Sequence, residues 1–209
     1  MTKVAHIIGN GDQVVMYKPA KGLHIACNQP PFHLNFYTSC IVDFKMCAAL
    51  TDGSVQINYD WTLGMRPKVW YEQNNGNFKM RFGHKIKEFY TVLPPYARMP
   101  GEEHHTGQGY TNFNCGHMAA HYTANKLKCS EIHLYGFDSL FDMNLRSYTD
   151  FVLNSDRGAS NNVRLNDRWR PIWQGIFNEF KDVQWVLYHP HDQIKFPIGK
   201  NVEIRTKNS

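Results

Sequence analysis

The stretch KVAHIIGNGD, residues 3–12, has the pattern of a buried strand that ends in a glycine-rich turn. Glycine at Gly9 and Gly11 permits positive φ and lets backbone N–H groups approach a phosphate or a ribose. Asn10, between them, adds an amide that both donates and accepts hydrogen bonds. The third glycine of a Gly-x-Gly-x-x-Gly fingerprint is missing, so the stretch by itself is equally typical of a tight structural turn.

Five other apolar or β-branched runs end in polar or glycine-containing turns and also predict strands. They cover residues 23–27, 39–44, 68–72, 132–135 and 183–187. Residues 168–180 show a strong helical pattern with one apolar face, and residues 116–127 show a weaker one. Strands that alternate with helices predict an α/β fold with a mostly parallel sheet covered by helices.

The composition predicts one domain over residues 1–209. The chain is 42% hydrophobic and 14% aromatic, which suffices for one good core but not for two. The charged fraction of 20% and the absence of low-complexity segments exclude a disordered, collagen-like or coiled-coil protein. Residues 45–66 and 94–112 are the least regular stretches, so we expect them to form lids or acceptor loops.

The cellular compartment is predicted from what the sequence lacks. No apolar run approaches the roughly 20 residues of a membrane span, and the first residues turn polar too early for a signal peptide. The five cysteines are odd in number and contain no Cys-x-x-Cys pair, so they indicate neither a disulfide framework nor a zinc knuckle. We therefore expect a cytoplasmic protein without a membrane span.

The net charge of +5 has a local source in residues 66–87, where six basic side chains stand against one acidic side chain. Aromatic side chains are interleaved with these cations, as in grooves that bind nucleic acid. A solvated surface above ordinary core aromatics would have the same composition, so both interpretations stay open. The basic residues are Arg66, Lys68, Lys79, Arg81, Lys85 and Lys87, and the aromatic ones are Trp70, Tyr71, Phe78 and Phe82.

Polar and glycine residues follow the predicted strands at their carboxyl ends, where parallel α/β sheets bind ligands. Two side-chain amides follow the second run, a Gly-x-Asp motif follows run 132–135, and a small residue with glycine opens helix 116–127. The N–H groups at that helix start favour an anion. Turn capping and ordinary βα construction are the structural alternatives. The candidate ligand-binding residues are Gly9, Asn10, Gly11, Asn28, Gln29, Asn114, Cys115, Gly116 and Asp138.

Taken together and in this order, the four motifs resemble those of the bacterial sialyltransferases that use CMP-sialic acid. The wider group of sialyltransferase-like Rossmann proteins, which includes 6-hydroxymethylpterin pyrophosphokinase-like proteins, shares much of the pattern. The resemblance is clearest at residues 5–32 and 112–142. It implies a single Rossmann-like domain whose nine candidate residues bind a nucleotide sugar, such as a CMP-sugar, without a metal. The Thr-Ser-Gly motif of that family stands here as Asn114-Cys115-Gly116, which replaces a hydroxyl by a thiol.

The general base is where the sequence departs from the family. Its candidate base is a histidine shortly before a helix in the second half, and the matching residues 156–163 contain no histidine. His189, after the last predicted strand, and His105, in the loop 94–112, are our candidate catalytic residues because histidine suits proton transfer near neutral pH. Tyr148 and Arg157 are the candidates to stabilise the leaving phosphate, although a solvated basic loop would contain them too.

Three functions fit these residues. We predict a glycosyltransferase-like enzyme with a nucleotide-sugar donor and no other cofactor, whose acceptor we expect to be a nucleic acid or a modified base that binds residues 66–87. The first alternative is a nucleotide or nucleotide-sugar binding protein without catalysis. The second is an ATP-dependent pyrophosphokinase-like enzyme, which needs magnesium held by carboxylates, and only Asp12, Asp138 and Asp142 are suitably placed in the sequence.

Overall fold

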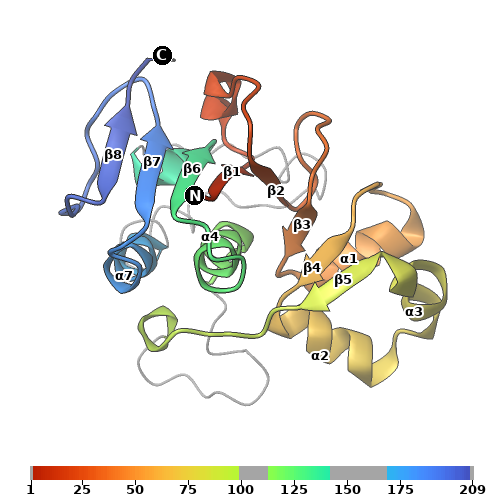
Figure 1. The fold of residues 1–209 in the computed structure, drawn as a ribbon. Helices are drawn as coiled ribbons and strands as arrows, with labels where there is room; N and C mark the ends of the chain where they lie inside the picture. The colour runs from red at the N-terminus through yellow and green to blue at the C-terminus, as the bar shows by residue number, and fades with distance from the viewer. Residues whose placement is uncertain (1, 99–112, 142–168, 208–209) are drawn as a thin grey trace.

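A computed structural model describes residues 2–98, 113–141 and 169–207. Within these ranges, eight parallel strands form one sheet in the order β5-β4-β3-β2-β1-β6-β7-β8 (Figure 1). The protein is therefore an α/β Rossmann-like domain with helices flanking a parallel sheet, as predicted. The strands are β1 (Val4–Ile8), β2 (Leu23–Cys27), β3 (Thr38–Ile41), β4 (Trp61–Leu63), β5 (Ile86–Phe89), β6 (Glu131–Tyr135), β7 (Gln184–Tyr188) and β8 (Val202–Arg205).

The helices cover the two faces of the sheet in two groups. Cys40 and Ile41 are neighbours in β3 and therefore point to opposite faces. Cys40 belongs to the core cluster that includes helices α4 and α7, whereas Ile41 belongs to the cluster that includes α1, α2 and α3. The helix bounds are α1 (Phe44–Asp52), α2 (Met65–Asn74), α3 (Gly76–Phe82), α4 (Cys115–Asn125) and α7 (Arg170–Glu179).

The side of the sheet on which the chain adds new strands changes between β1 and β6. The chain builds outward from β1 to β5, returns through α4 and continues on the other side of β1 with β6, β7 and β8. In open parallel sheets, ligands bind beyond the carboxyl ends of the strands at such a switch point. The loops that follow β1 and β6 therefore mark the edge at which a site is expected.

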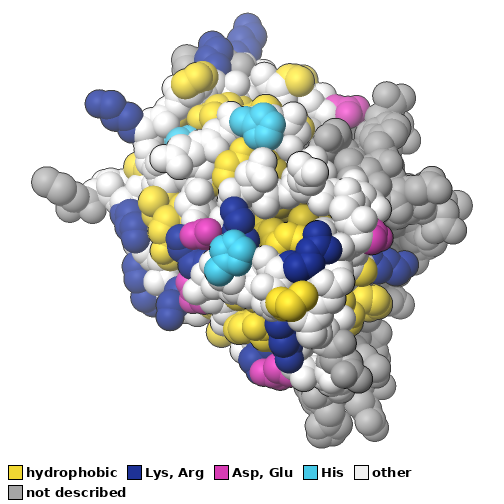
Figure 2. Space-filling view, turned by 90° about the vertical axis from the view of Figure 1, so that its right-hand side faces the viewer, with side chains coloured by type: hydrophobic (Ala, Val, Ile, Leu, Met, Phe, Trp, Pro, Cys, Tyr) yellow, Lys and Arg dark blue, Asp and Glu magenta, His cyan; other side chains and the backbone are white. Residues whose placement is uncertain are grey.

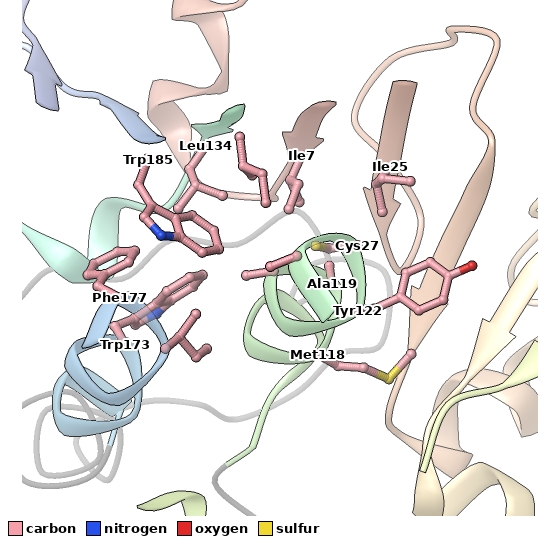
Figure 3. Close-up of a cluster of buried hydrophobic side chains, with 14 of the residues drawn as sticks. Ile7, Ile25, Cys27, Met118, Ala119, Tyr122, Leu134, Trp173, Phe177 and Trp185 are labelled. Carbon is pink, nitrogen blue, oxygen red and sulfur yellow. The ribbon is translucent and has the colours of Figure 1, made fainter. Parts of the chain in front are cut away.

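Helices α4 and α7 lie side by side against the strands of the switch point (Figure 1). The buried residues of α7 recur with helical spacing, at Ile172, Trp173, Ile176 and Phe177, which is why the sequence predicted this helix correctly. Figure 3 shows Trp173 and Phe177 from α7 next to Trp185, with Ala119, Tyr122 and Met118 of α4 beneath the strands. This packing holds the start of α4 against the carboxyl edge of the sheet.

The first half of the chain contains more regular structure than the sequence predicted. Residues 45–66, expected to be an irregular lid, contain most of α1 and all of β4. In α1, Met46, Cys47, Ala49 and Leu50 are buried at helical spacing, and Gly53 ends the helix with a φ of 85°, a left-handed conformation that glycine adopts without strain. The expectation of a loop here was wrong because the apolar pattern is short.

The strand predicted at residues 68–72 was also wrong, since these residues lie inside α2. Trp70 and Tyr71 are typical of strands, but their rings contact Phe78 of α3. That contact supports a helix through the tertiary structure rather than through local preference. The predicted strand 39–44 likewise ends early, because β3 stops at Ile41 and α1 begins at Phe44.

Three histidines lie in register across β2, β1 and β6. His6 pairs with His24 on one side and with His133 on the other, and the ring centroids are 5.2 and 4.7 Å apart. Ile7, which follows His6, belongs to the core cluster that includes α4, so the His6 ring points to the opposite face of the sheet. His24 and His133 pair with His6 in register and point to the same face as His6. This row brings three titratable rings into contact, of which His6 and His133 are buried and His24 is partly exposed.

In the ranges that the structure describes, no helix has the length and apolar character needed to cross a membrane.

Candidate functional site

The loops after β1 and β6 are bonded to each other at the switch point. Gly9 N donates to Tyr135 O at 2.8 Å, and Gly11 N donates to Gly136 O at 2.9 Å. A β-carbon at Gly9 would lie 2.6 Å from Gly136 O, closer than van der Waals contact allows. The glycines of the first motif are therefore required for two backbones to meet, whatever ligand lies beyond them.

Asp138 fastens the same two loops together. Its carboxylate accepts from the backbone N–H of Gln13, with N···O distances of 3.3 and 3.1 Å, and only 7% of the residue is exposed. A β-carbon at Gly11 would lie 2.7 Å from Asp138 Oδ2. Asp138, which the sequence predicted to bind a ligand, therefore stabilises the loop after β1.

Three side-chain oxygens at the ends of β1 and β2 are buried without a hydrogen-bond partner among the described residues: Asn10 Oδ1, Asn28 Oδ1 and Gln29 Oε1. The amide nitrogen of Asn10 donates to Cys27 O at 2.6 Å, which directs the amide oxygen away from that carbonyl. A buried acceptor without a donor costs about 1–3 kcal/mol. Three such acceptors at one edge are able to accept hydrogen bonds from added N–H or O–H groups.

The start of α4 reaches this edge and is capped. Asn114 Oδ1 accepts from His117 N at 2.9 Å, and Asn114 N lies 3.1 Å from His117 Nδ1. The other ring nitrogen, Nε2, lies 3.2 Å from Trp169 O. Because a carbonyl only accepts, Nε2 carries the proton and Nδ1 accepts, so His117 is neutral here. Its ring joins α4 to the start of α7.

Cys115 and Gly116 complete the edge. Asn28 Nδ2 lies 3.3 Å from Cys115 Sγ, which joins the end of β2 to the start of α4. The hydrogen bond between Cys27 and Cys115, together with burial, raises the pKa of Cys27 well above its ordinary value. Cys27 is therefore a neutral thiol at neutral pH and not a nucleophile. A β-carbon at Gly116 would lie 2.6 Å from the Phe137 ring.

The nine predicted ligand residues thus come together at one edge of the sheet, from four separate parts of the chain. His189 lies on the same edge, directly after β7. It is 2% exposed, and its ring stacks on Phe141 and meets His191, each with a centroid distance of 4.2 Å. The other catalytic candidate, His105, and the leaving-group candidates, Tyr148 and Arg157, lie outside the described residues.

Sequence reasoning missed an ion pair at this edge. Arg66 Nη2 lies 3.3 Å from Asp43 Oδ1, and both side chains are partly shielded from solvent. Asp43 directly precedes α1, and Arg66 lies in the first turn of α2 after β4. The signal in the sequence was the acidic residue before a helix start, a common capping position, which the expectation of a loop at 45–66 concealed.

The aromatic side chains of residues 66–87 have a structural role. Phe78 is 1% exposed, and Trp70, Tyr71 and Phe82 pack against the same core cluster. Trp70, Tyr71 and Phe82 nevertheless stay partly exposed, so these rings support the core and keep part of their surface accessible. The basic side chains of the segment remain at the surface of this cluster.

Across the described ranges, no group of three or more His, Cys, Asp or Glu side chains is arranged to hold a metal ion. Comparison of the chain with protein-family models, with curated proteins and with solved structures found no match.

Proposed function

We propose that the carboxyl edge at the switch point binds a nucleotide sugar and that the protein is a glycosyltransferase-like enzyme. The observation that carries the proposal is the set of three buried amide oxygens, on Asn10, Asn28 and Gln29, that accept no hydrogen bond from any described residue. A nucleoside offers the matching donors in the amino group of its base and the hydroxyls of its ribose. The structure would gain three hydrogen bonds upon binding.

The diphosphate or monophosphate of the donor would face the start of α4. This helix has 11 residues, and its first N–H groups and dipole favour an anion. The glycines of the β1 and β6 loops let these two loops meet beside that helix start. A helix start of this kind supports phosphate binding without a metal, as the resemblance to the CMP-sugar sialyltransferases implies.

In the proposed reaction, an acceptor hydroxyl attacks the anomeric carbon of the sugar, and the bond between that carbon and the phosphate oxygen breaks. A base takes the hydroxyl proton, and the electron pair of the broken bond leaves with the nucleotide. We assign the base to His189 or His105, and the stabilisation of the leaving phosphate to Tyr148 and Arg157. The proposed acceptor is a nucleic acid or a modified base.

A nucleotide-binding protein without catalysis is the second candidate. Both ring nitrogens of His117, near the start of α4, already form hydrogen bonds, with Asn114 N and Trp169 O. This histidine therefore has no unused lone pair that could take a proton from an acceptor hydroxyl, which favours a protein without catalysis. The pyrophosphokinase-like function ranks below both, because the carboxylate of Asp138, needed there for magnesium, already accepts from Gln13.

A thermal-shift panel tests the donor site. CMP-, UDP- and GDP-sugars and ATP are compared with and without magnesium. A ligand at about a hundredfold its Kd raises the free energy of unfolding by about 2.7 kcal/mol. For a chain of this size, that raises the unfolding temperature by roughly 5 °C or more. Gln29→Ala removes one of the three acceptors. We expect it not to lower the unfolding temperature of the free protein, because the acceptor that it removes has no partner there, and to reduce the shift with a nucleotide sugar. A structural role for Gln29 would instead lower the unfolding temperature.

Gln193→Ala serves as the matched control, because Gln193 is exposed and lies outside the site. No stabilisation by any nucleotide sugar, or an undiminished shift in Gln29→Ala, would refute the proposed site. Stabilisation by ATP only with magnesium would support the pyrophosphokinase-like function instead. Release of free nucleotide from a bound nucleotide sugar, followed by phosphorus NMR, then separates the enzyme from the binding protein.

A further inference from the structure

A second hollow lies on the α3 side of the molecule, away from the carboxyl edge. It has a volume of about 240 Å³, is open to solvent, and lies between the end of α1, the start of β4 and the end of α3. Leu50, Val55 and Trp61 line it and are nearly fully buried. The partly exposed ring of Phe82 completes its apolar floor. Figure 2, which faces this side, shows hydrophobic side chains in a depression with Lys and Arg side chains beside it.

Two cations are held at the rim of this hollow. Arg81 donates to the carbonyl oxygen of Thr51, and its guanidinium carbon lies 4.8 Å from the centre of the Phe82 ring. Lys85 Nζ donates to Asn58 O at 3.2 Å. Both side chains are thus positioned by carbonyl groups, which fix a cation without neutralising its charge.

Acidic side chains pair with other basic residues of the same segment. Lys68 forms an ion pair with Glu72 at 2.6 Å, and Lys87 forms one with Asp60 at 3.6 Å. The carboxylate of Asp52, close to the hollow in sequence, accepts from Ser54. Among the described residues, no Asp or Glu lies within ion-pair distance of Arg81 or Lys85. Arg81 and Lys85 therefore bring two positive charges to the rim of the hollow that no described acidic side chain pairs with.

The chemistry of the lining selects the ligand. An apolar floor accepts a flat, weakly polar ring, and the rim adds the side-chain amides of Gln56 and Asn58, which donate to and accept from base edges. The indole Nε1 of Trp61 is buried and donates to no described residue, so the floor also contains an unused donor. An aliphatic anion would leave all these polar groups without partners. A nucleobase flanked by phosphates matches both the floor and the two cations.

We propose that this hollow binds one nucleotide of a single-stranded nucleic acid, with the base on the floor and the flanking phosphates on Arg81 and Lys85. Trp61 is the first residue of β4, so the hollow lies at the amino end of the sheet, opposite the proposed donor site. The hollow is therefore a docking site for the strand rather than the place of reaction. The proposed partner of the hollow is a single-stranded nucleic acid, and its binding does not depend on the proposed donor site.

Fluorescence anisotropy of a labelled oligothymidylate of about ten nucleotides tests this proposal. The double variant Arg81→Gln, Lys85→Gln is compared with Lys68→Gln, Lys79→Gln, which removes the same charge from the same segment outside the hollow. At about 50 mM salt we expect the first pair to weaken binding about tenfold or more and the control pair to have little effect. The slope of log K against log salt should fall by about 1.4, as two lost phosphate contacts predict for a single strand.

Two further probes identify the ligand. An abasic strand of the same length has the phosphates without the bases, and decanoate has an anion on an aliphatic chain. The proposal predicts much weaker binding of the abasic strand and no displacement of the oligonucleotide by decanoate. No binding of oligothymidylate at low salt, equal losses in the two double variants, equal binding of the abasic strand, or displacement by decanoate would each overturn it.

The two sites can fail separately. Arg81→Gln, Lys85→Gln should keep the thermal shift with a nucleotide sugar, because both residues lie far from the carboxyl edge. Gln29→Ala should keep the affinity for the oligonucleotide. Loss of both properties in either variant would mean a general loss of the fold, which the unfolding temperature of the free protein reports directly. The proposal for the hollow is overturned if oligonucleotide affinity follows Gln29 instead of Arg81 and Lys85.

Discussion

Replacing His6 by glutamine is expected to remove much of the acid sensitivity of folding. His6 is 3% exposed. Its Nε2 donates to Lys21 O at 3.1 Å, and the Tyr135 hydroxyl lies 3.4 Å from its Nδ1. Both ring nitrogens are therefore engaged in the neutral form. A proton on this ring would place a charge inside the protein between two further imidazoles, those of His24 and His133.

The magnitude follows from the pKa of His6. Burial, as the largest cause, and the neighbouring His133 and His24 lower this pKa from 6.5 to about 4, against the opposing effects of the Lys21 carbonyl and Glu131. Below pH 6.5 the unfolded chain takes up a proton that the folded protein does not bind. Stability is therefore complete above the unfolded pKa and falls as the pH drops, by about 2 kcal/mol at pH 5 and about 3 kcal/mol at pH 4.

Urea unfolding at about pH 7.5 and about pH 5 measures this difference in free energy. His6→Gln will be less stable at neutral pH, because two hydrogen bonds change, so the quantity compared is the loss between the two pH values. We expect that loss to be about 2 kcal/mol smaller in His6→Gln than in the unmodified protein. His84→Gln is the control, because His84 is exposed and leaves the His6 row intact. An equal loss in His6→Gln and the unmodified protein would refute the reasoning.

Three further substitutions test the packing behind the site. Gly9→Ala should cost about 2 kcal/mol or more in urea unfolding, because its β-carbon would lie 2.6 Å from Gly136 O; Gly76→Ala, where a β-carbon meets nothing within 4 Å, should cost nothing. Asn114→Ala should lose about 1 kcal/mol through the helix cap, and Asn114→Asp should restore most of it in the same assay. Trp173→Ala should lose about 3–5 kcal/mol by leaving a cavity, and retained stability in calorimetry would contradict its place in the core.

The parts of the fold that were predicted correctly have long, continuous apolar signals. Strands β1, β2, β6 and β7 lie within one or two residues of their predicted bounds, because three or four apolar residues stand between turn residues in each. Strand β4 has only the three residues Trp61–Leu63, too few to show alternation. Strand β5, Ile86–Phe89, begins in the last two residues of the basic segment and is only partly buried. Its pairing with β4 comes from the sheet and not from its own sequence.

Residues 68–72, predicted to be a strand but found in α2, also show that a short segment does not determine its own secondary structure. Aromatic and β-branched residues in a short run favour a strand locally, and a window of five residues cannot reveal the helical period. The contacts of Trp70 and Tyr71 with Phe78, together with burial against α1, favour the helix. Contacts between different helices cannot be predicted from the five residues of the segment alone.

The order of residues along the chain was enough to predict which groups lie at the carboxyl edge, because glycines, amides and a helix start directly follow the strands there. Which of their atoms lack a hydrogen-bond partner depends on how the chain folds. The Asp138 carboxylate accepts from Gln13, 125 residues away in the chain, and Asn28 meets Cys115 across 87 residues. The oxygens of Asn10, Asn28 and Gln29 receive no such partner from the described residues. Hydrogen bonds between distant segments form only when the sheet is assembled, and so the unused acceptors could not be found before it.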